Sequence, residues 1–398
     1  MRFRHCLLPF VVPQVVPVSA IHIPFNRPTF LGAEQQYLAQ AAASGHWAGD
    51  GTFTERCQTI LEQTLGSRRA FLTTSCTHAL EMAALLVNIA PGDDVIVPAF
   101  TFVSTVNAFV LRGARPVFAD VRADTLNLDE RLLEGLVTPR TKVIVPVHYA
   151  GVSCEMDAIL DVAGRHAIAV VEDNAHGLFG TYRNRYLGTF GVLAAQSFHE
   201  TKNFSCGEGG ALLVNDPAMV ERAEILREKG TNRSRFFRGK VDKYGWVDLG
   251  SSYLPSDLLA AVLCAQLEQR EAVQQRRRHL WLQYHSALSS WAAARGIQTP
   301  VVPTHCGQAY HMYYLLLPSL GQRQALIGRL RARGILSVFH YQPLHLSEMG
   351  RRWGGAPGQC PVTEDVSDRL LRLPFYNSLT DDEQDEVVRA VMKDYDAA

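Results

Sequence analysis

Short apolar runs alternate with amphipathic segments from about residue 70 onward. The runs are apolar at consecutive positions, as is typical of strands that are covered on both faces. The segments between them carry apolar residues at helical spacing, for example 76–90 and 156–167. This alternation predicts an α/β fold with a largely parallel sheet between helices. The expected strands lie in "DDVIVPAF" (93–100), "ARPVFADV" (114–121), "TKVIVPVHYAG" (141–151), "AIAVVEDNAHG" (167–177), "AAQSF" (194–198) and "ALLVND" (211–216).

The last third of the chain has a different pattern. A long helical pattern covers roughly 256–290, with Ser256 or Asp257 as its N-cap. From this change in pattern we predict a large domain over 23–270 and a small α+β domain over 271–398. In the small domain we expect strands near "HMYYLLLP" (311–318) and "ILSVFHY" (335–341), and helices near "RQALIGRLRARG" (323–334) and "TDDEQDEVVRAVMKDY" (380–395).

Polar residues follow several of the predicted strands. His148 follows "VIVPV", Asp173 follows "AIAVVE", and Ser197 and Lys202 follow "LAAQ". Ligands of such sheets bind beyond the carboxyl ends of the strands, so these side chains are expected at one edge. Lys202 stands in a polar loop between two apolar strands, and "GEGG" (207–210) lets the chain turn back into the sheet. A lysine that forms an imine must lose its proton near neutral pH, and enclosure favours that loss.

Other residues at this edge fit a flat, phosphorylated ligand. Cys76 and Thr77 begin an amphipathic helix, whose free N–H groups favour a phosphate, although ordinary N-capping leaves the same pattern. The Phe102 ring, after a strand end, can stack on a cofactor or pack in the core. Asp173 can keep a ring nitrogen protonated, as an electron-sink cofactor such as pyridoxal phosphate requires, or cap the next helix. His176 can bond a phenolic oxygen or be structural.

Composition narrows the classes of function. The 39 basic and 39 acidic residues give a formal net charge of zero, so there is no electrostatic case for binding nucleic acid or an anionic membrane. No stretch approaches 18 uncharged apolar residues, and we expect no membrane span. Scattered cysteines without a CxxC pair indicate a reducing, cytoplasmic compartment. Residues 1–22 carry an apolar run broken by prolines, which predicts a disordered extension rather than a signal peptide.

Several motifs together resemble a known family. The stretches "TSCT", "GDDVIVPAFTFVST", "VPVHYAG", "VVEDNAHG" and "SFHETKN…GEGG" resemble the DegT/DnrJ/EryC1/StrS sugar-nucleotide aminotransferases, and the resemblance extends from about Ile23 to near the C-terminus. It implies fold type I of the pyridoxal-phosphate enzymes, which is aspartate aminotransferase-like. This fold has a mainly parallel seven-stranded sheet between helices and a smaller C-terminal α+β domain. Pyridoxal 5'-phosphate is the implied cofactor.

The resemblance also implies a role for each candidate in the cofactor site. Lys202 would bind the cofactor covalently and then carry the proton between cofactor and substrate. Asp173 would pair with the pyridinium nitrogen. Phe102 would stack on the ring, and His176 would lie near the phenolic oxygen.

The implied phosphate site draws on two subunits. Cys76, mainly through its backbone N–H, would hold the phosphate together with Thr77 and Ser197. In the family an asparagine of the neighbouring subunit completes this site, and Asn232 in "KGTNRS" is the candidate here. The expected assembly is therefore a homodimer with shared active sites.

The implied substrates are L-glutamate and a dTDP-linked sugar. Tyr341 and His345 in "HYQPLH" (340–345) are candidates for contact with the sugar nucleotide. The histidines of this stretch could also suggest a metal, but no carboxylate or cysteine cluster accompanies them, and no metal is expected.

The expected reaction transfers the amino group to C4 of dTDP-4-dehydro-6-deoxy-D-glucose and gives dTDP-4-amino-4,6-dideoxy-D-galactose. Its product would serve a cell-surface polysaccharide such as enterobacterial common antigen or O-antigen. One alternative is an aminotransferase of the same fold that acts on another keto-sugar nucleotide, UDP-linked or 3-keto. A related dehydratase has histidine at the position of Lys202, and a non-catalytic sensor could have lost Lys202 or Asp173; this chain keeps both.

Overall fold

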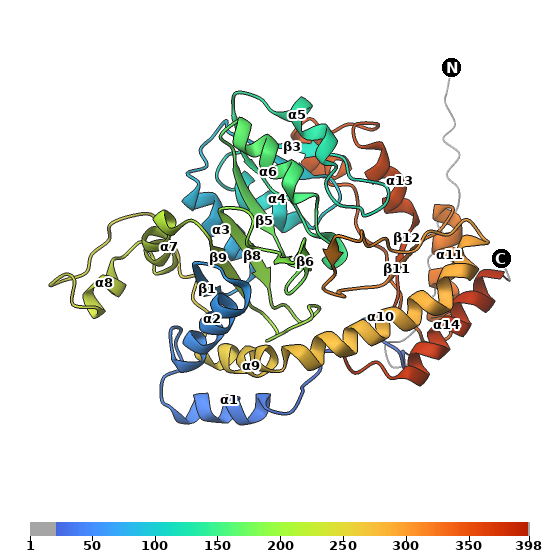
Figure 1. The fold of residues 1–398 in the computed structure, drawn as a ribbon, viewed down its shortest axis with the longest axis horizontal. Coiled ribbons are helices and arrows are strands. Elements are labelled where there is room, and N and C mark those ends of the chain that lie inside the picture. Colours follow the sequence, from blue (N-terminus) through green and yellow to red (C-terminus); the bar gives the residue numbers. More distant parts are fainter. Residues whose placement is uncertain (1–20, 397–398) are drawn as a thin grey trace, which may run out of the picture.

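A seven-stranded sheet forms the centre of the molecule (Figure 1). The structure is a computed structural model, and it describes residues 21–396. Strand β9 runs antiparallel to both of its neighbours, and the other adjacent strands pair in parallel. Each apolar run quoted above coincides with one strand, so the largely parallel sheet is confirmed. In spatial order the strands are β1 (Arg69–Thr73), β9 (Gly210–Val214), β8 (Leu193–Ser197), β5 (Ala169–Asp173), β4 (Thr141–Ile144), β2 (Asp94–Pro98) and β3 (Arg115–Ala119).

Helices cover both faces of the sheet, because alternate residues of each strand point to opposite sides. In β9, for example, Leu212 joins one core cluster and Leu213 joins another. One face is covered by α3 (Cys76–Leu86), α4 (Val103–Val110) and α7 (Val220–Arg227). The other face is covered by α2 (Thr52–Leu65), α9 (Asp257–Glu268), α6 (Met156–Arg165) and α5 (Leu133–Leu136).

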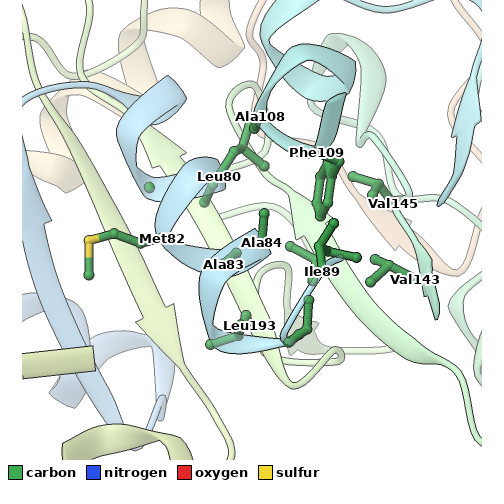
Figure 2. Packing of buried hydrophobic residues seen from close by; sticks show 14 of the residues in the cluster. Leu80, Met82, Ala83, Ala84, Ile89, Ala108, Phe109, Val143, Val145 and Leu193 are labelled. Atoms are coloured by element: carbon green, nitrogen blue, oxygen red, sulfur yellow. The ribbon is translucent and has the colours of Figure 1, made fainter. Parts of the chain in front are cut away.

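Figure 2 shows the first of these cores at close range. Phe109 of α4 and Ile89, which follows α3, lie against Val143 and Val145 of the sheet. All four side chains are at most 2% exposed. Burying one such side chain contributes roughly 1.5–3 kcal/mol relative to exposure, so this core fixes the C-terminal ends of α3 and α4 against the sheet.

The helix predicted over 256–290 is two helices. Ser256 caps α9 as predicted, and its Oγ accepts a hydrogen bond from the backbone N–H of Leu259 at 3.4 Å. Helix α9 ends at Gln269, whose φ of −98° and ψ of 19° depart from helical values, and α10 (Arg270–Ala293) follows at once. In Figure 1, α10 runs from the sheet to the C-terminal elements on the right. Sequence periodicity alone could not detect this break, because it leaves the apolar spacing nearly unchanged.

A second core lies among the C-terminal elements. It is formed by α10, α11 (Leu320–Ala332), α14 (Asp381–Asp396) and a two-stranded sheet of β11 (Tyr314–Leu316) with β12 (Leu370–Arg372). Both predicted helices and the strand near 311–318 are therefore confirmed. The strand expected over 335–341 is wrong, because this segment makes only single bridges to Ile23 and Arg372. After the bridge at Val338, residues 339–341 line a cavity instead of pairing with a strand.

Shorter elements complete the described chain. Helix α8 projects with its flanking loops away from the body at the left of Figure 1. Ile23 packs in the C-terminal core, and the predicted extension 1–22 lies outside the described residues except for its last two positions. Within 21–396 no helix is long and apolar enough to cross a membrane. The remaining elements are α1 (Glu34–Ala43), α8 (Arg233–Phe237), α12 (Glu348–Arg352), α13 (Pro361–Arg369) and the small sheet of β10 (Cys306–Gly307), β6 (Thr181–Tyr182) and β7 (Arg185–Tyr186).

Candidate active site

A cavity of about 570 Å³ lies at the carboxyl edge of the sheet. The ends of β5 and β8 and the starts of α3 and α4 form one side, and residues 339–342 with Arg372 form the other. The predicted edge site is therefore a cavity between the main sheet and the C-terminal elements. It brings together most of the residues singled out in the sequence, namely Cys76, Thr77, Phe102, Asp173, His176, Ser197, Lys202 and Tyr341.

Lys202 is the single lysine among the residues that line this cavity. It lies in the turns that follow β8, and its backbone N–H donates to the carbonyl oxygen of His199 at 2.9 Å. Burial is the main cause that lowers the pKa of its ammonium group from 10.5 to about 8, and the positive charge of Arg372 acts in the same direction. Near neutral pH a useful fraction of this amine is therefore unprotonated and nucleophilic.

Strand β9 passes directly against the start of α3. A Cβ atom at Gly210 would lie 2.3 Å from the carbonyl carbon of Ser75 and 2.4 Å from the backbone nitrogen of Cys76, so only glycine fits there. The Ser75 Oγ caps the helix by accepting from the His78 N–H at 3.1 Å. The first N–H groups of a helix have no partner within it, and here they open onto the cavity at Cys76 and Thr77. This arrangement suits a phosphate group.

Asp173 is held as an oriented carboxylate. It is only 5% exposed; its Oδ2 accepts from the Thr105 hydroxyl at 2.7 Å, and its Oδ1 accepts from the Ala175 N–H at 3.1 Å. The Thr105 hydroxyl is in turn 2.8 Å from that of Thr101. No helix lies between Asp173 and β6, so the alternative that Asp173 caps the next helix is wrong; its Oδ1 caps a turn instead. The residue lines the cavity and can face a protonated ring nitrogen.

His176 lies beside a second histidine in this cavity. Its ring stacks on that of His311 with centroids 4.2 Å apart, and the His311 Nδ1 is 2.9 Å from the Asn203 Oδ1. Burial lowers the pKa of both imidazoles well below the ordinary range, so both are neutral. The buried Nδ1 of His176 has no hydrogen-bond partner among residues 21–396. It is available to an oxygen of a bound ligand.

Aromatic side chains form the outer wall. Phe102, at the N-cap of α4, is 56% exposed, so it is not a core residue, and its ring centroid is 6.2 Å from that of Tyr341. Phe339 also lines the cavity. An exposed ring at a cavity rim can stack on a flat ligand.

Two predicted site residues lie elsewhere. His345 is fully buried; its Nε2 is 2.9 Å from the Glu364 Oε1, and its ring packs 6.2 Å from that of Phe118. The expectation that His345 contacts a sugar nucleotide is therefore not supported, because this side chain is engaged inside the fold. Asn232 caps α8, and its Oδ1 accepts from the Gly245 N–H at 2.8 Å. It is absent from the cavity of its own chain, and its role in a neighbouring subunit stays a prediction.

Sequence reasoning missed three residues that shape the site: Thr105, His311 and Arg372. Thr105 lies inside the quoted motif "PAFTFVST", but nothing in the sequence indicates that it contacts Asp173. The stacking of His311 on His176 depends on tertiary structure. Arg372 carries a detectable signal, because a lone arginine inside the apolar run "LLRLPF" is unusual for a buried segment.

The cavity fits pyridoxal phosphate. A partly deprotonated lysine, an oriented carboxylate, an unpartnered buried nitrogen and a free helix start occur together, and each corresponds to one functional group of that cofactor. When bound, the cofactor withdraws electrons from the bonds at the reacting carbon. Among residues 21–396 there is no group of three or more His, Cys, Asp or Glu side chains that could hold a metal ion.

Comparison with known proteins points to the same chemistry. The model of the DegT/DnrJ/EryC1/StrS aminotransferase family matches residues 30–392. The spore coat polysaccharide biosynthesis protein SpsC of Bacillus subtilis is 34% identical over 377 residues, which cover 93% of this chain and 96% of SpsC.

Solved structures share the fold. The PLP form of Spr1654 from Streptococcus pneumoniae, described as a sugar aminotransferase, superposes with a TM-score of 0.87 at 28% identity, covering 94% of this chain and 99% of Spr1654. Aminotransferase TlmJ from Streptoalloteichus hindustanus gives 0.86 at 30% identity, with coverage of 94% and 99%. The predicted fold type I and its cofactor, pyridoxal phosphate, are confirmed. The chain belongs to the DegT/DnrJ/EryC1/StrS aminotransferase family and is a pyridoxal-phosphate-dependent sugar aminotransferase.

Proposed function

We propose that this enzyme transfers an amino group from L-glutamate to C4 of dTDP-4-dehydro-6-deoxy-D-glucose. The product would be dTDP-4-amino-4,6-dideoxy-D-galactose, for a cell-surface polysaccharide such as enterobacterial common antigen or O-antigen. The observation that carries the chemistry is a single cavity lysine with a pKa of about 8, in the same cavity as the oriented carboxylate of Asp173. The choice of sugar rests on the resemblance of residues 81–122, 199–203, 227–254 and 370–379 to family members that aminate this sugar. The name of SpsC, which refers to polysaccharide biosynthesis, supports the proposed pathway class.

In this proposal Lys202 does the proton transfer. It holds the cofactor covalently at rest, and its released amine takes the proton from the reacting carbon of the donor. In the second half-reaction it returns a proton to C4 of the sugar. A general base works best when its pKa lies near the working pH, and a value of about 8 meets that condition.

The other residues hold and orient the cofactor. Asp173 stabilises a positive charge on the ring nitrogen, and Phe102 covers one face of the ring. The phosphate is bound at the start of α3, where the backbone donors and hydroxyls gather. The residues proposed for this phosphate site are Cys76, Thr77 and Ser197, and the residue proposed for the phenolic oxygen is His176.

The sugar nucleotide would enter past the aromatic wall. Tyr341 and Phe339 border the cavity on the side opposite α3. Apolar sugar faces and bases pack on such rings with little loss of side-chain entropy. We therefore retain Tyr341 as a proposed substrate contact, and Phe339 joins it.

We further propose a cytoplasmic homodimer with shared active sites. The loop that carries Asn232 and α8 exposes large aromatic side chains, including Phe237 at 68% and Trp246 at 81% exposure. Monomers rarely expose such a cluster, and it suits a surface that a second subunit covers. In the dimer, Asn232 would complete the phosphate site of the partner. A reducing location agrees with the free thiols found for every cysteine of the described chain.

The test is product identification. Purified enzyme is incubated with ¹⁵N-labelled L-glutamate and, separately, with dTDP- and UDP-linked 4-keto and 3-keto sugars. NMR should find ¹⁵N at C4 of the dTDP sugar, in the galacto configuration, and Lys202→Ala should give no product. Amination at C3, or reaction only with UDP sugars, would overturn the substrate while leaving the aminotransferase chemistry in place.

A further inference from the structure

One cation in the active-site cavity has no anionic partner. Arg372, the last residue of β12, lines the cavity that also contains Lys202, and it is only 9% exposed. No Asp or Glu side chain within 21–396 pairs with it, and its Nε has no hydrogen-bond partner there. Residues 1–20 contain no acidic residue at all. A guanidinium removed from water without a carboxylate is costly, so this position requires an explanation.

The groups around Arg372 are neutral. Its Nη1 is 3.3 Å from the Nε2 of His340, whose Nδ1 is 3.0 Å from the Tyr149 hydroxyl. Burial first, and the Arg372 charge second, lower the pKa of His340 well below its ordinary range, so this imidazole accepts from Arg372 without compensating its charge. Burial raises the pKa of the Tyr149 and Tyr341 phenols, which also stay uncharged. The guanidinium therefore keeps free donors and its full charge.

The carboxylates that line the cavity are already engaged. Asp173 accepts from Thr105 and from its own turn, and Glu208 lies 3.7 Å from the His199 ring nitrogen. The charge of Arg372 nonetheless reaches the reactive end of the cavity, because it contributes to the lowered pKa of Lys202. The described part of the chain thus supplies no anion to balance the charge of Arg372, and we look for that anion on a substrate that binds at the reacting amine.

The two proposed substrates differ in where they carry charge. L-Glutamate bears a carboxylate on the reacting carbon itself, and a planar carboxylate matches the fork of a guanidinium. In the sugar nucleotide the charge is on the diphosphate, which is attached across the sugar ring from C4. A single buried guanidinium in the same cavity as the reacting amine fits the first of these anions.

We propose that Arg372 binds the carboxylate on the reacting carbon of the amino donor. This inference rests on L-glutamate as the proposed donor. During the sugar half-reaction the same guanidinium faces uncharged sugar atoms. Arg372 is thus a donor-binding residue, and its removal impairs one half of the reaction.

The experiment compares the two half-reactions in the holoenzyme by following the cofactor absorbance in single turnovers. Arg372→Met should lower kcat/KM for L-glutamate by roughly 10- to 100-fold, because a charge-assisted pair is lost. L-Glutamine should lose a similar factor, since it carries the same carboxylate on the reacting carbon. The reaction of the pyridoxamine form with the dTDP sugar should change less than threefold, and Arg372→Lys should partly restore the donor step.

A matched control is Arg331→Met. Arg331 is half-buried and its Nε also has no hydrogen-bond partner within the described chain, but it lies on α11, outside this cavity. It should leave both half-reactions unchanged. Equal losses in both half-reactions of Arg372→Met, an unchanged donor step, or a loss with L-glutamate but not with L-glutamine would each overturn the assignment.

Failure of the proposed function would look different. If the wild-type enzyme does not react with L-glutamate, the proposed donor is wrong. Binding of glutarate, a non-reacting dicarboxylate, then still tests Arg372. Calorimetry with the holoenzyme should show affinity for glutarate in the wild type and a loss of roughly tenfold or more in Arg372→Met. Equal affinity in both proteins would contradict carboxylate binding at this residue.

Discussion

At the scale of single residues, the site places two groups with opposite requirements in one cavity. In the proposed reaction Lys202 must lose a proton, and the Asp173 carboxylate must face the ring nitrogen of the cofactor. Burial lowers the pKa of the lysine, while two hydrogen bonds, from Thr105 and the Ala175 N–H, hold the carboxylate in place. The pKa of Lys202 is lowered by burial even though the charge of Asp173 in the same cavity acts to raise it.

The pKa of Lys202 predicts how cofactor capture depends on pH. The unprotonated amine reacts with the aldehyde, so the capture rate of the apoenzyme should rise with pH up to about 8 and then level off. Stopped-flow absorbance after addition of pyridoxal phosphate measures this rate. Because the Arg372 charge helps to lower this pKa, Arg372→Met should shift the midpoint to higher pH. A rate that still climbs steeply toward 10.5 would mean that the amine is not perturbed.

Removal of the Asp173 charge should separate binding from turnover. In Asp173→Asn the Lys202 amine remains, so the cofactor should still be captured. Transamination should fall roughly 10²- to 10³-fold, because the stabilisation of the charged ring nitrogen is lost. The control Thr105→Val removes only one of the hydrogen bonds to Asp173 and should cost less. Unchanged turnover in Asp173→Asn would exclude the proposed role.

At the scale of elements, the active site depends on how closely β9 approaches the start of α3. Gly210 pairs with Thr73 of β1 and Ser197 of β8, so it lies between two strands and cannot move away from the helix. The contact that holds α3 in place is thus made by backbone atoms. The glycine cluster after Lys202 serves the packing of the helix start as well as the turn.

Gly210→Ala should therefore damage both stability and cofactor binding. Its Cβ would overlap backbone atoms of Ser75 and Cys76, and overpacking of this kind costs roughly 1–3 kcal/mol. Urea unfolding and cofactor titration measure the two effects. The matched control is Gly164→Ala in α6, where a Cβ meets nothing within 4 Å and should stabilise by about 0.5–1 kcal/mol. Wild-type behaviour of Gly210→Ala would contradict the close approach.

The elements also show how far the sequence predicts this fold. Six of the seven strands of the main sheet were predictable because runs such as "VIVP" are apolar on both faces, and the edge position of Asp173 and Lys202 followed from them. The seventh strand, β1, was not among the expected ones. The break at Gln269 was not predictable, because it leaves the apolar spacing nearly unchanged. The absence of a strand near 335–341 was not predictable either, because strand pairing depends on distant parts of the chain. His345 illustrates the same limit, since its pairing with Glu364 involves a separate helix.

At the scale of the whole molecule, the cavity lies between the main sheet and the C-terminal elements. We propose the domain division at 270/271 because α9 belongs to the core under the sheet and α10 contributes to the C-terminal core. A relative movement of the two parts would then change the cavity directly. The exposed loop around α8 is the surface that we propose a second subunit covers, and that subunit would supply Asn232.

Hybrid dimers test whether the active sites are shared. Lys202→Ala and Asn232→Ala are each expected to be inactive or nearly so. When the two variants are unfolded, mixed and refolded, half of the dimers pair one of each, and these dimers contain one site with both native residues. About a quarter of wild-type activity should return. No recovery, with mixed dimers verified by differential tagging, would show that each subunit builds its site alone.

Borohydride trapping shows whether Lys202 carries the cofactor, as we propose. Reduction of the holoenzyme makes the lysine–cofactor link permanent, and peptide mass spectrometry then locates the modified residue. We expect a single modified peptide, "HETKN", with the phosphopyridoxyl group on Lys202. Modification of Lys142, Lys229, Lys240, Lys243 or Lys393 instead, or of no lysine, would contradict it.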